Sequence, residues 1–277
     1  MKAALLQLNG SDDPEANLQI TEALIDQASE AGAGFVLTPE VTNCVSLDRA
    51  HQHSVLHCEA EDSTLLRLRE RAAARDVWLL IGSLALKTDD PDGRLANRSF
   101  LVDPTGTIVA RYDKIHMFDV DVSATESYRE SAGYRPGREA VFYNAPFGCI
   151  GLTICYDLRF PTLYRDLAQA GAEIITVPSA FSPVTGAAHW ETLLRARAIE
   201  TGSYILAPAQ TGTHAAARGR SRVTYGHSMA VDPWGRVLAE AGTDPGVRLI
   251  DIDRAAVASA RSRIPAWAEN RAFESPA

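Results

Sequence analysis

The residues best suited to nucleophilic chemistry are one cysteine and two charged residues that lie at the ends of predicted strands. Cys155 directly follows an apolar run over residues 148–154, and Glu40 follows a shorter run over residues 35–38. A cysteine attacks a carbonyl group only as its thiolate, so it needs a proton acceptor and gains from a nearby cation. Glu40 could be the acceptor and Lys114 the cation. Because the three residues are far apart in the chain, their types alone do not show that they meet.

The elements that must position these residues alternate between strands and helices. Strands are predicted over residues 3–8, 35–38, 77–81, 97–102, 107–112, 148–154, 173–177 and 204–207, with more between 223 and 252. Helices are predicted from the N-cap at Asp13-Pro14 to Gly32 and over residues 65–74, 161–170 and 188–201. This pattern favours an α/β fold with two layers of sheet covered by helices. Reactive groups in such folds gather beyond the carboxyl ends of strands.

The bulk properties favour a soluble protein that acts on a small molecule. The chain has 277 residues, 46% of them hydrophobic, which fits one domain over residues 1–277 with a loose arm at 269–277. A net charge of -8 argues against nucleic acid or an anionic membrane as partner. No signal peptide or membrane-spanning stretch is recognisable, and the four cysteines follow no disulfide or zinc spacing. We therefore expect a cytoplasmic location with reduced thiols.

Three separated segments resemble the signature boxes of the nitrilase, or carbon–nitrogen hydrolase, superfamily. They are Pro39-Glu40, the segment Tyr112-Asp113-Lys114-Ile115-His116, and the segment Ile154-Cys155-Tyr156-Asp157-Leu158-Arg159-Phe160-Pro161. The order Glu, Lys, Cys also matches that superfamily. The resemblance covers most of the chain, and residues 151–201 and 225–235 are most similar to the branch that contains deaminated glutathione amidase and ω-amidase.

The resemblance implies a fold and a set of roles. The fold would be an αββα sandwich that forms homodimers, with no metal or organic cofactor. Glu40 would take the thiol proton of Cys155, while Lys114 and the backbone N–H of Tyr156 would stabilise the oxyanion. Glu130 matches the second glutamate of the family, which supports the lysine and positions the substrate. Because Glu40 would serve twice, we expect burial to bring its pKa towards the working pH.

The residues that would contact the substrate are less strongly indicated. Arg159 either pairs with a substrate carboxylate or braces Asp157 or a dimer interface. The other expected contacts come from the loop after residues 173–177 and from two further positions, namely Ser179, Ala180, Phe181, Thr185 and Tyr225. The stretch 210–224 is longer than in similar proteins and leaves the substrate preference open, as does its basic part with His214, Arg218, Arg220 and Arg222.

The leading hypothesis is a cysteine-dependent amidase. It would hydrolyse a terminal amide of a small carboxylate-bearing substrate to acid and ammonia through a thioester, with deaminated glutathione first and α-ketoglutaramate second. One alternative is an N-carbamoyl amino acid or amine hydrolase on the same fold. Another is an interaction or regulatory protein of this fold with incidental activity. A metal site is not expected, because the nearest candidate group lacks a recurrent ligand spacing and comprises His51, His53, His57 and Cys58.

Overall fold

Two six-stranded sheets form the centre of the protein. The computed structural model describes residues 1–123, 126–217 and 219–274. The first sheet has the strand order β16-β1-β2-β3-β4-β5 and the second has the order β15-β14-β11-β10-β9-β8. In each sheet three neighbouring strands are parallel, β1, β2 and β3 in one and β9, β10 and β11 in the other. The first sheet comprises β1 (Lys2–Gln7), β2 (Phe35–Leu37), β3 (Trp78–Leu86), β4 (Ala96–Val102), β5 (Ile108–Asp113) and β16 (Gly246–Asp251).

The second sheet repeats this arrangement with shorter strands. It comprises β8 (Val141–Ala145), β9 (Gly148–Leu152), β10 (Ile174–Thr176), β11 (Tyr204–Ala207), β14 (Met229–Val231) and β15 (Val237–Glu240). Two small hairpins lie outside the sheets, β6 (Asp119–Ser123) with β7 (Glu126–Arg129), and β12 (Thr211–Thr213) with β13 (Val223–Tyr225).

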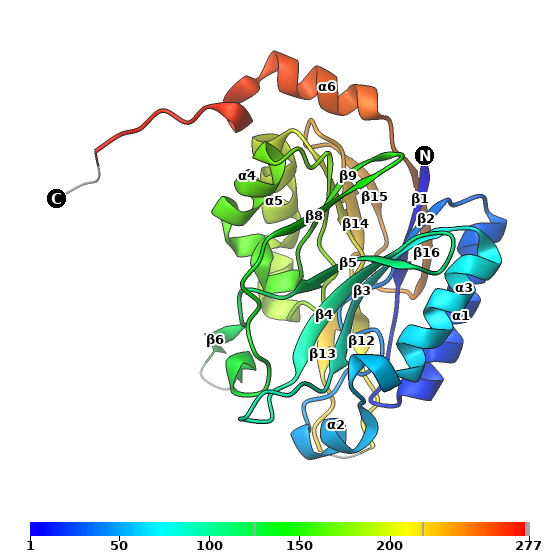
Figure 1. Cartoon of the computed structure of the whole chain (residues 1–277). Helices are drawn as coiled ribbons and strands as arrows, with labels where there is room; N and C mark the ends of the chain where they lie inside the picture. The colour runs from blue at the N-terminus through cyan, green and yellow to red at the C-terminus, as the bar shows by residue number, and fades with distance from the viewer. Residues whose placement is uncertain (124–125, 218, 275–277) are drawn as a thin grey trace.

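Helices cover the outer face of each sheet, so the layers run α, β, β, α (Figure 1). Helices α1 (Pro14–Glu30) and α3 (Ser63–Arg75) lie on the first sheet, and α4 (Pro161–Gln169) and α5 (Pro183–Thr201) lie on the second. The αββα sandwich implied by the resemblance is confirmed.

Burial on both faces explains why the central strands are continuously apolar. Successive residues of β1 alternate between two cores, because side chains point to opposite faces of a strand. Ala3 and Leu5 contact the core shared with the second sheet, whereas Ala4 and Leu6 pack with residues of α1 and α3. The first predicted helix begins as expected, since the Asp13 side chain accepts hydrogen bonds from the N–H groups of Glu15 and Ala16.

Several elements were not predicted from the sequence. Helix α2 (Arg49–Val55) lies in a stretch for which no element was predicted, and the Asp48 side chain caps it at the His51 N–H. Helix α6 (Arg254–Arg263) and the turn at Pro265–Ala268 follow the last strand. These short polar segments lack a clear apolar period, so the N-cap residues Asp48 and Asp253 were the main indication of a helix in the sequence.

The C-terminal segment extends beyond α6 and away from the sheets (Figure 1). Its first residues contact α4, where the Gln169 side-chain amide donates to the Asn270 side chain at 2.8 Å. Residues 271–274 are exposed, and residues 275–277 of the expected arm lie outside the described residues. Within the described part of the chain, no helix combines the length and apolarity needed to cross a bilayer.

Candidate active site

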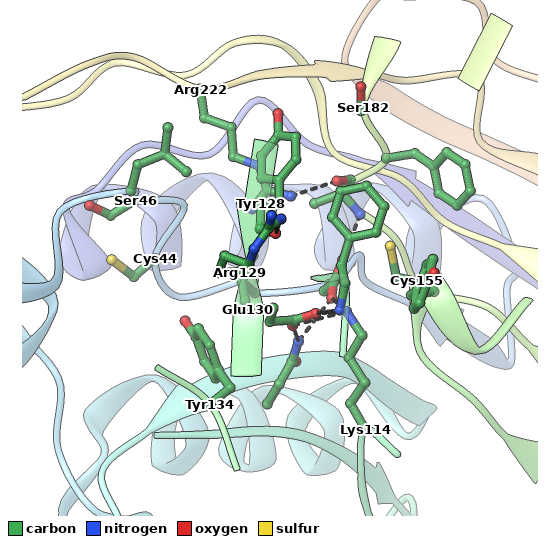
Figure 2. Close-up of a pocket in the computed structure, with 18 of the residues that line it drawn as sticks. Cys44, Ser46, Lys114, Tyr128, Arg129, Glu130, Tyr134, Cys155, Ser182 and Arg222 are labelled. Atoms are coloured by element: carbon green, nitrogen blue, oxygen red, sulfur yellow. Dashed lines mark hydrogen bonds and ion pairs between the residues drawn. The ribbon is translucent and has the colours of Figure 1, made fainter. Parts of the chain in front are cut away.

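A buried lysine between two glutamates forms the centre of the site. Lys114, directly after β5, places Nζ 2.9 Å from Oε1 of Glu40 and 2.9 Å from Oε2 of Glu130. Glu40 follows β2, and its other oxygen accepts a hydrogen bond from the Ala180 backbone N–H at 2.8 Å. Glu130 begins a short helical turn and accepts from the Phe118 N–H at 2.6 Å. Both carboxylates are therefore fixed by backbone donors as well as by the ammonium. Figure 2 shows the Lys114 side chain pointing toward Glu130.

Cys155 lies beside this cluster at the exit of β9. Its thiol is near enough to the Glu40 carboxylate for each group to shift the pKa of the other, and its backbone N–H donates to the Pro178 carbonyl at 3.0 Å. The backbone of Cys155 has φ +49°, in the left-handed region that non-glycine residues seldom adopt. Val41, next to Glu40, has φ +47°, which is rarer still for a β-branched residue. Strained backbone thus lies at both strand exits that carry the reactive pair.

Glycine allows the backbone before Glu40 to come close to β3. A Cβ atom on Gly82 would lie 2.0 Å from the carbonyl oxygen of Thr38 and 2.5 Å from that of Pro39. The Gly82 N–H also donates to the Thr38 hydroxyl at 3.0 Å. The side chain of Ser83 then accepts from the Val41 N–H at 2.8 Å, which holds the strained residue in place.

Asp157 joins the strand of the lysine to the turn of the cysteine. Its buried carboxylate accepts from the Tyr112 hydroxyl at 2.6 Å and from the Ile154 N–H at 2.9 Å. The backbone N–H of His116 donates to the same carboxylate at 3.0 Å. Tyr112 and His116 flank Lys114, while Ile154 and Asp157 flank Cys155, so the two sequence boxes are tied together directly. Asp157 is therefore a positioning residue, which the sequence indicated only as part of a motif and as one alternative partner of Arg159.

The charges of the cluster determine one another's protonation. Burial alone would raise the pKa of Glu40, but the Lys114 ammonium and the Arg222 guanidinium outweigh burial and lower it. Burial and the Glu40 charge raise the pKa of the Cys155 thiol. Burial lowers the pKa of Lys114, but the carboxylates of Glu130 and Glu40 raise it by more, so the pKa of Lys114 lies well above its usual value. The expectation that burial brings Glu40 towards neutral pH is wrong, and at pH 7 the site holds a carboxylate, a neutral thiol and an ammonium.

The site opens into a cavity of about 240 Å³. Tyr156 lines it, and its backbone N–H donates to none of the described residues outside its own helical turn. Of the expected substrate contacts, Ala180, Phe181 and Thr185 line the cavity. The structure therefore brings these three side by side with Tyr156 and the Glu, Lys and Cys cluster.

The other expected contacts lie outside the cavity lining. Ser179 is fully buried and its hydroxyl donates to the Val177 carbonyl at 3.0 Å. The Tyr225 ring packs against Gly186 on α5. Arg159 lies over the rings of Tyr156 and Phe181, at 5.9 and 5.5 Å from their centroids, and not on Asp157.

Other cavity residues were not recognised as site residues in the sequence. Asn97 on β4 donates to Oε1 of Glu40 at 2.8 Å. Tyr128, Arg129 and Arg222 also line the cavity (Figure 2). Asn97 lies near the start of β4 beside the polar Arg98 and Ser99, so no distinct signal in the sequence marks it. No group of three or more His, Cys, Asp or Glu side chains suited to a metal occurs among residues 1–123, 126–217 and 219–274.

Comparison with known proteins identifies the family. Residues 2–262 match the carbon–nitrogen hydrolase family. The chain belongs to that family. This carbon–nitrogen hydrolase is 40% identical to a deaminated glutathione amidase of Yersinia enterocolitica over 271 residues, which cover 97% of this chain and 92% of that protein. The chain is accordingly a hydrolase of carbon–nitrogen bonds other than peptide bonds, of the amidase type.

Solved structures show the same fold. The hydrolase resembles the C. elegans NitFhit protein with a TM-score of 0.88 and 34% identity, covering 98% of this chain and 65% of NitFhit. It also resembles a mutant amidase from Nesterenkonia sp. AN1 with a TM-score of 0.77 and 26% identity, covering 96% of this chain and 98% of that one. In that structure acrylamide has added to the active-site cysteine.

Proposed function

We propose that this protein is a cysteine-dependent amidase in which Cys155 forms a thioester with the acyl half of a small carboxylate-bearing amide. The observation that carries the proposal is that Cys155 and Glu40 line one cavity, where Glu40 pairs with Lys114 at 2.9 Å. A neutral thiol beside a carboxylate can transfer its proton as it attacks, so no resting thiolate is required.

The residues supply each proton transfer of the reaction. Cys155 Sγ attacks the carbonyl carbon as Glu40 takes the thiol proton, and the oxyanion is stabilised by the Lys114 ammonium and the Tyr156 N–H. The C–N bond breaks and the proton passes from Glu40 to the leaving nitrogen. Glu40, ionised again, takes a proton from the water that attacks the thioester. The C–S bond then breaks and the proton returns to sulfur. Glu130 holds Lys114 in place throughout.

The proposed substrates are deaminated glutathione and α-ketoglutaramate, supported by the 40% identity to a protein named for the first. Both carry the same α-ketoglutaryl acyl group and would give the same thioester. Their leaving groups differ, because α-ketoglutaramate releases ammonia whereas the amide of deaminated glutathione is internal and releases cysteinylglycine. The expectation of ammonia from deaminated glutathione is therefore wrong. The product to follow is therefore α-ketoglutarate, and ammonia identifies only the primary amide.

The Cys155→Ala variant tests the proposal. We expect purified wild-type protein to release α-ketoglutarate from at least one substrate, and Cys155→Ala to lower kcat by about 10⁴-fold or more. Mass spectrometry of rapidly quenched wild-type protein should find the acyl group on the peptide that contains residue 155. Cys58→Ala is the matched control, because Cys58 is a free thiol outside the cavity.

Two results would contradict the proposal. Turnover that survives in Cys155→Ala would exclude the thioester route. Hydrolysis of an N-carbamoyl amino acid, with none of either proposed amide, would assign the same residues to a carbamoyl hydrolase.

We also propose that the protein is a homodimer in the cytoplasm. The proposal of a dimer rests on the family resemblance and is supported by an exposed apolar patch, defined by Ile199, Trp234 and Ile264. A reducing compartment agrees with the four free cysteines Cys44, Cys58, Cys149 and Cys155.

A further inference from the structure

Arg222 presents a cation to the cavity without a carboxylate of its own. It lies directly before β13, lines the cavity, and donates from Nη2 to the Ala180 carbonyl at 2.7 Å. No carboxylate oxygen of the described residues lies within 4.0 Å of its guanidinium. A guanidinium has five N–H donors, and among the residues that the structure describes the one hydrogen bond of this guanidinium is that to Ala180. Most of the fork is therefore available to a ligand.

The charge of the cavity shows why this cation matters. Glu40 and Glu130 carry two negative charges and Lys114 carries one positive charge, so with a neutral thiol the cluster has a net charge of −1. An anionic substrate would be repelled by that cluster alone. Lys114 pairs with both carboxylates, so its positive charge is already more than balanced before an anionic substrate binds. Arg222 is close enough to lower the pKa of Glu40, so its field reaches the reacting groups.

The other arginines near the cavity are less suited to the task. Arg129 pairs with Asp121 at 2.8 Å, and 56% of its side chain is exposed. Arg159 does not line the cavity, and its guanidinium lies over the rings of Tyr156 and Phe181.

Arg49 shares with Arg222 a place in the lining and the lack of an acidic partner among the described residues. Its guanidinium, however, lies over the Tyr134 ring and donates to the Arg129 carbonyl at 3.3 Å. Arg222 differs in that its charge acts on Glu40.

The hairpin β12–β13 holds Arg222 in position. The carbonyl of Arg222 accepts from the His214 N–H at 2.8 Å, and the ring of His214 bonds the Gly10 carbonyl at 2.6 Å and the Thr224 hydroxyl at 2.7 Å. Further along the loop, the Ala217 N–H donates to the Asp12 carboxylate at 2.7 Å. The basic stretch is thus anchored to the first sheet's loops, and Arg222 enters the cavity from a fixed backbone.

We propose that Arg222 is a specificity-determining residue that binds a carboxylate of the substrate through the free N–H groups of its guanidinium. The proposal deepens the amidase function and rests on it. A planar fork matches a carboxylate in a bidentate geometry, and a partly buried pair of this kind is strong because few waters compete for it. Arg222 would then neutralise the acid group of the substrate while Lys114 serves the reacting carbonyl.

Two amides of the same shape test the proposal. Succinamate carries a carboxylate at the far end, and 4-oxopentanamide replaces one carboxylate oxygen with a methyl group. We expect Arg222→Met to lower kcat/KM for succinamate by about 100-fold, mainly through KM, and to leave that for 4-oxopentanamide within about threefold. Arg220→Met is the matched control, because Arg220 is exposed, lies in the same stretch and does not line the cavity. It should leave both values within about twofold.

A binding experiment separates this proposal from the amidase function. Calorimetry on Cys155→Ala and on the double variant Cys155→Ala/Arg222→Met measures succinamate binding without turnover. Loss of binding in the double variant supports the role of Arg222 even if the wild type hydrolyses neither amide, a result that would contradict the amidase function alone. Equal losses of kcat/KM for both amides, with succinamate binding unchanged, would show that Arg222 acts only through Glu40 and would overturn the proposal. Unfolding curves confirm that each variant is folded.

Discussion

At the scale of single residues, the site is a set of hydrogen bonds that favour the charged form of Glu40. Lys114, Asn97 and the Ala180 N–H all donate to its carboxylate. Each donor stabilises the ionised base and so keeps it ready to take a proton. Asn97 is the least expected of them, since the amide lies inside a strand and its own Oδ1 has no partner in the described part of the chain.

Asn97→Ala should raise the pKa of Glu40, because a donor to the charged form is lost. Glu40 acts as a base only when ionised, so the acid limb of the pH profile of kcat/KM should move to higher pH by about one unit. Measurements of kcat/KM between pH 4 and pH 8 provide the check. Ser99→Ala is the control, because Ser99 is buried two residues further along β4 and bonds the Ile81 carbonyl at 3.2 Å. An unchanged acid limb in Asn97→Ala would contradict this account of the base.

Strand-end positions were predictable from the sequence because continuous apolar runs mark buried strands. The exits of β2 and β9 were located within about two residues, and they do bring Glu40 and Cys155 together. Asn97 and Arg222 were beyond such reasoning. The contact of Asn97 with Glu40 depends on which face of β4 it occupies, and Arg222 depends on the register of a hairpin joined by a long loop. Neither the face of β4 nor the register of the hairpin produces a periodic pattern in the sequence.

At the scale of elements, the hairpin β12–β13 depends on a buried neutral histidine. Burial lowers the pKa of His214 to about 4, and the nearby Arg222 lowers it as well, although the Gly10 carbonyl opposes the shift. Between about pH 6.5 and pH 4, His214 binds a proton in the unfolded chain but not in the folded chain. The stability that neutral His214 contributes is therefore complete above pH 6.5 and decreases as the pH falls towards 4. The hairpin that carries Arg222 should therefore loosen in acid.

His214→Gln should remove this pH dependence while it keeps one donor and one acceptor. Between pH 7 and pH 5 the free energy of unfolding of the wild type should fall by about 2 kcal/mol more than that of the variant. Urea unfolding at both pH values measures the difference. His53→Gln is a control, because His53 is exposed on α2. Equal falls in the wild type and in His214→Gln would contradict a neutral buried His214.

At the scale of the whole molecule, the fold brings two similar sheets face to face so that their strand exits share one cavity. The αββα order was predicted from the family resemblance, and the alternation of strands and helices already favoured it. The helical layer that contains α5 carries a feature that bears on dimer formation. The apolar patch of Ile199, Trp234 and Ile264 lies where α5 ends, beside the turn before β15 and the end of α6, and it is exposed.

Ile199→Glu should weaken the proposed homodimer, because a charge would replace an apolar side chain that is 56% exposed in one chain. Sedimentation should give twice the chain mass of 29.9 kDa for the wild type and a value near one chain mass for the variant. Leu66→Glu is the control, because Leu66 is similarly exposed but lies on α3 in the opposite helical layer. A wild type that sediments as one chain would contradict the dimer.

The left-handed backbone at Val41 and Cys155 limits how the protein can be made more heat-resistant. Glycine relieves such a conformation, so both positions would attract an engineer who seeks a higher melting temperature. Glycine at position 155 removes the nucleophile, and glycine at position 41 increases the backbone flexibility next to the base Glu40. Useful gains must therefore come from parts of the molecule that do not carry the chemistry, such as the exposed faces of α1 and α3.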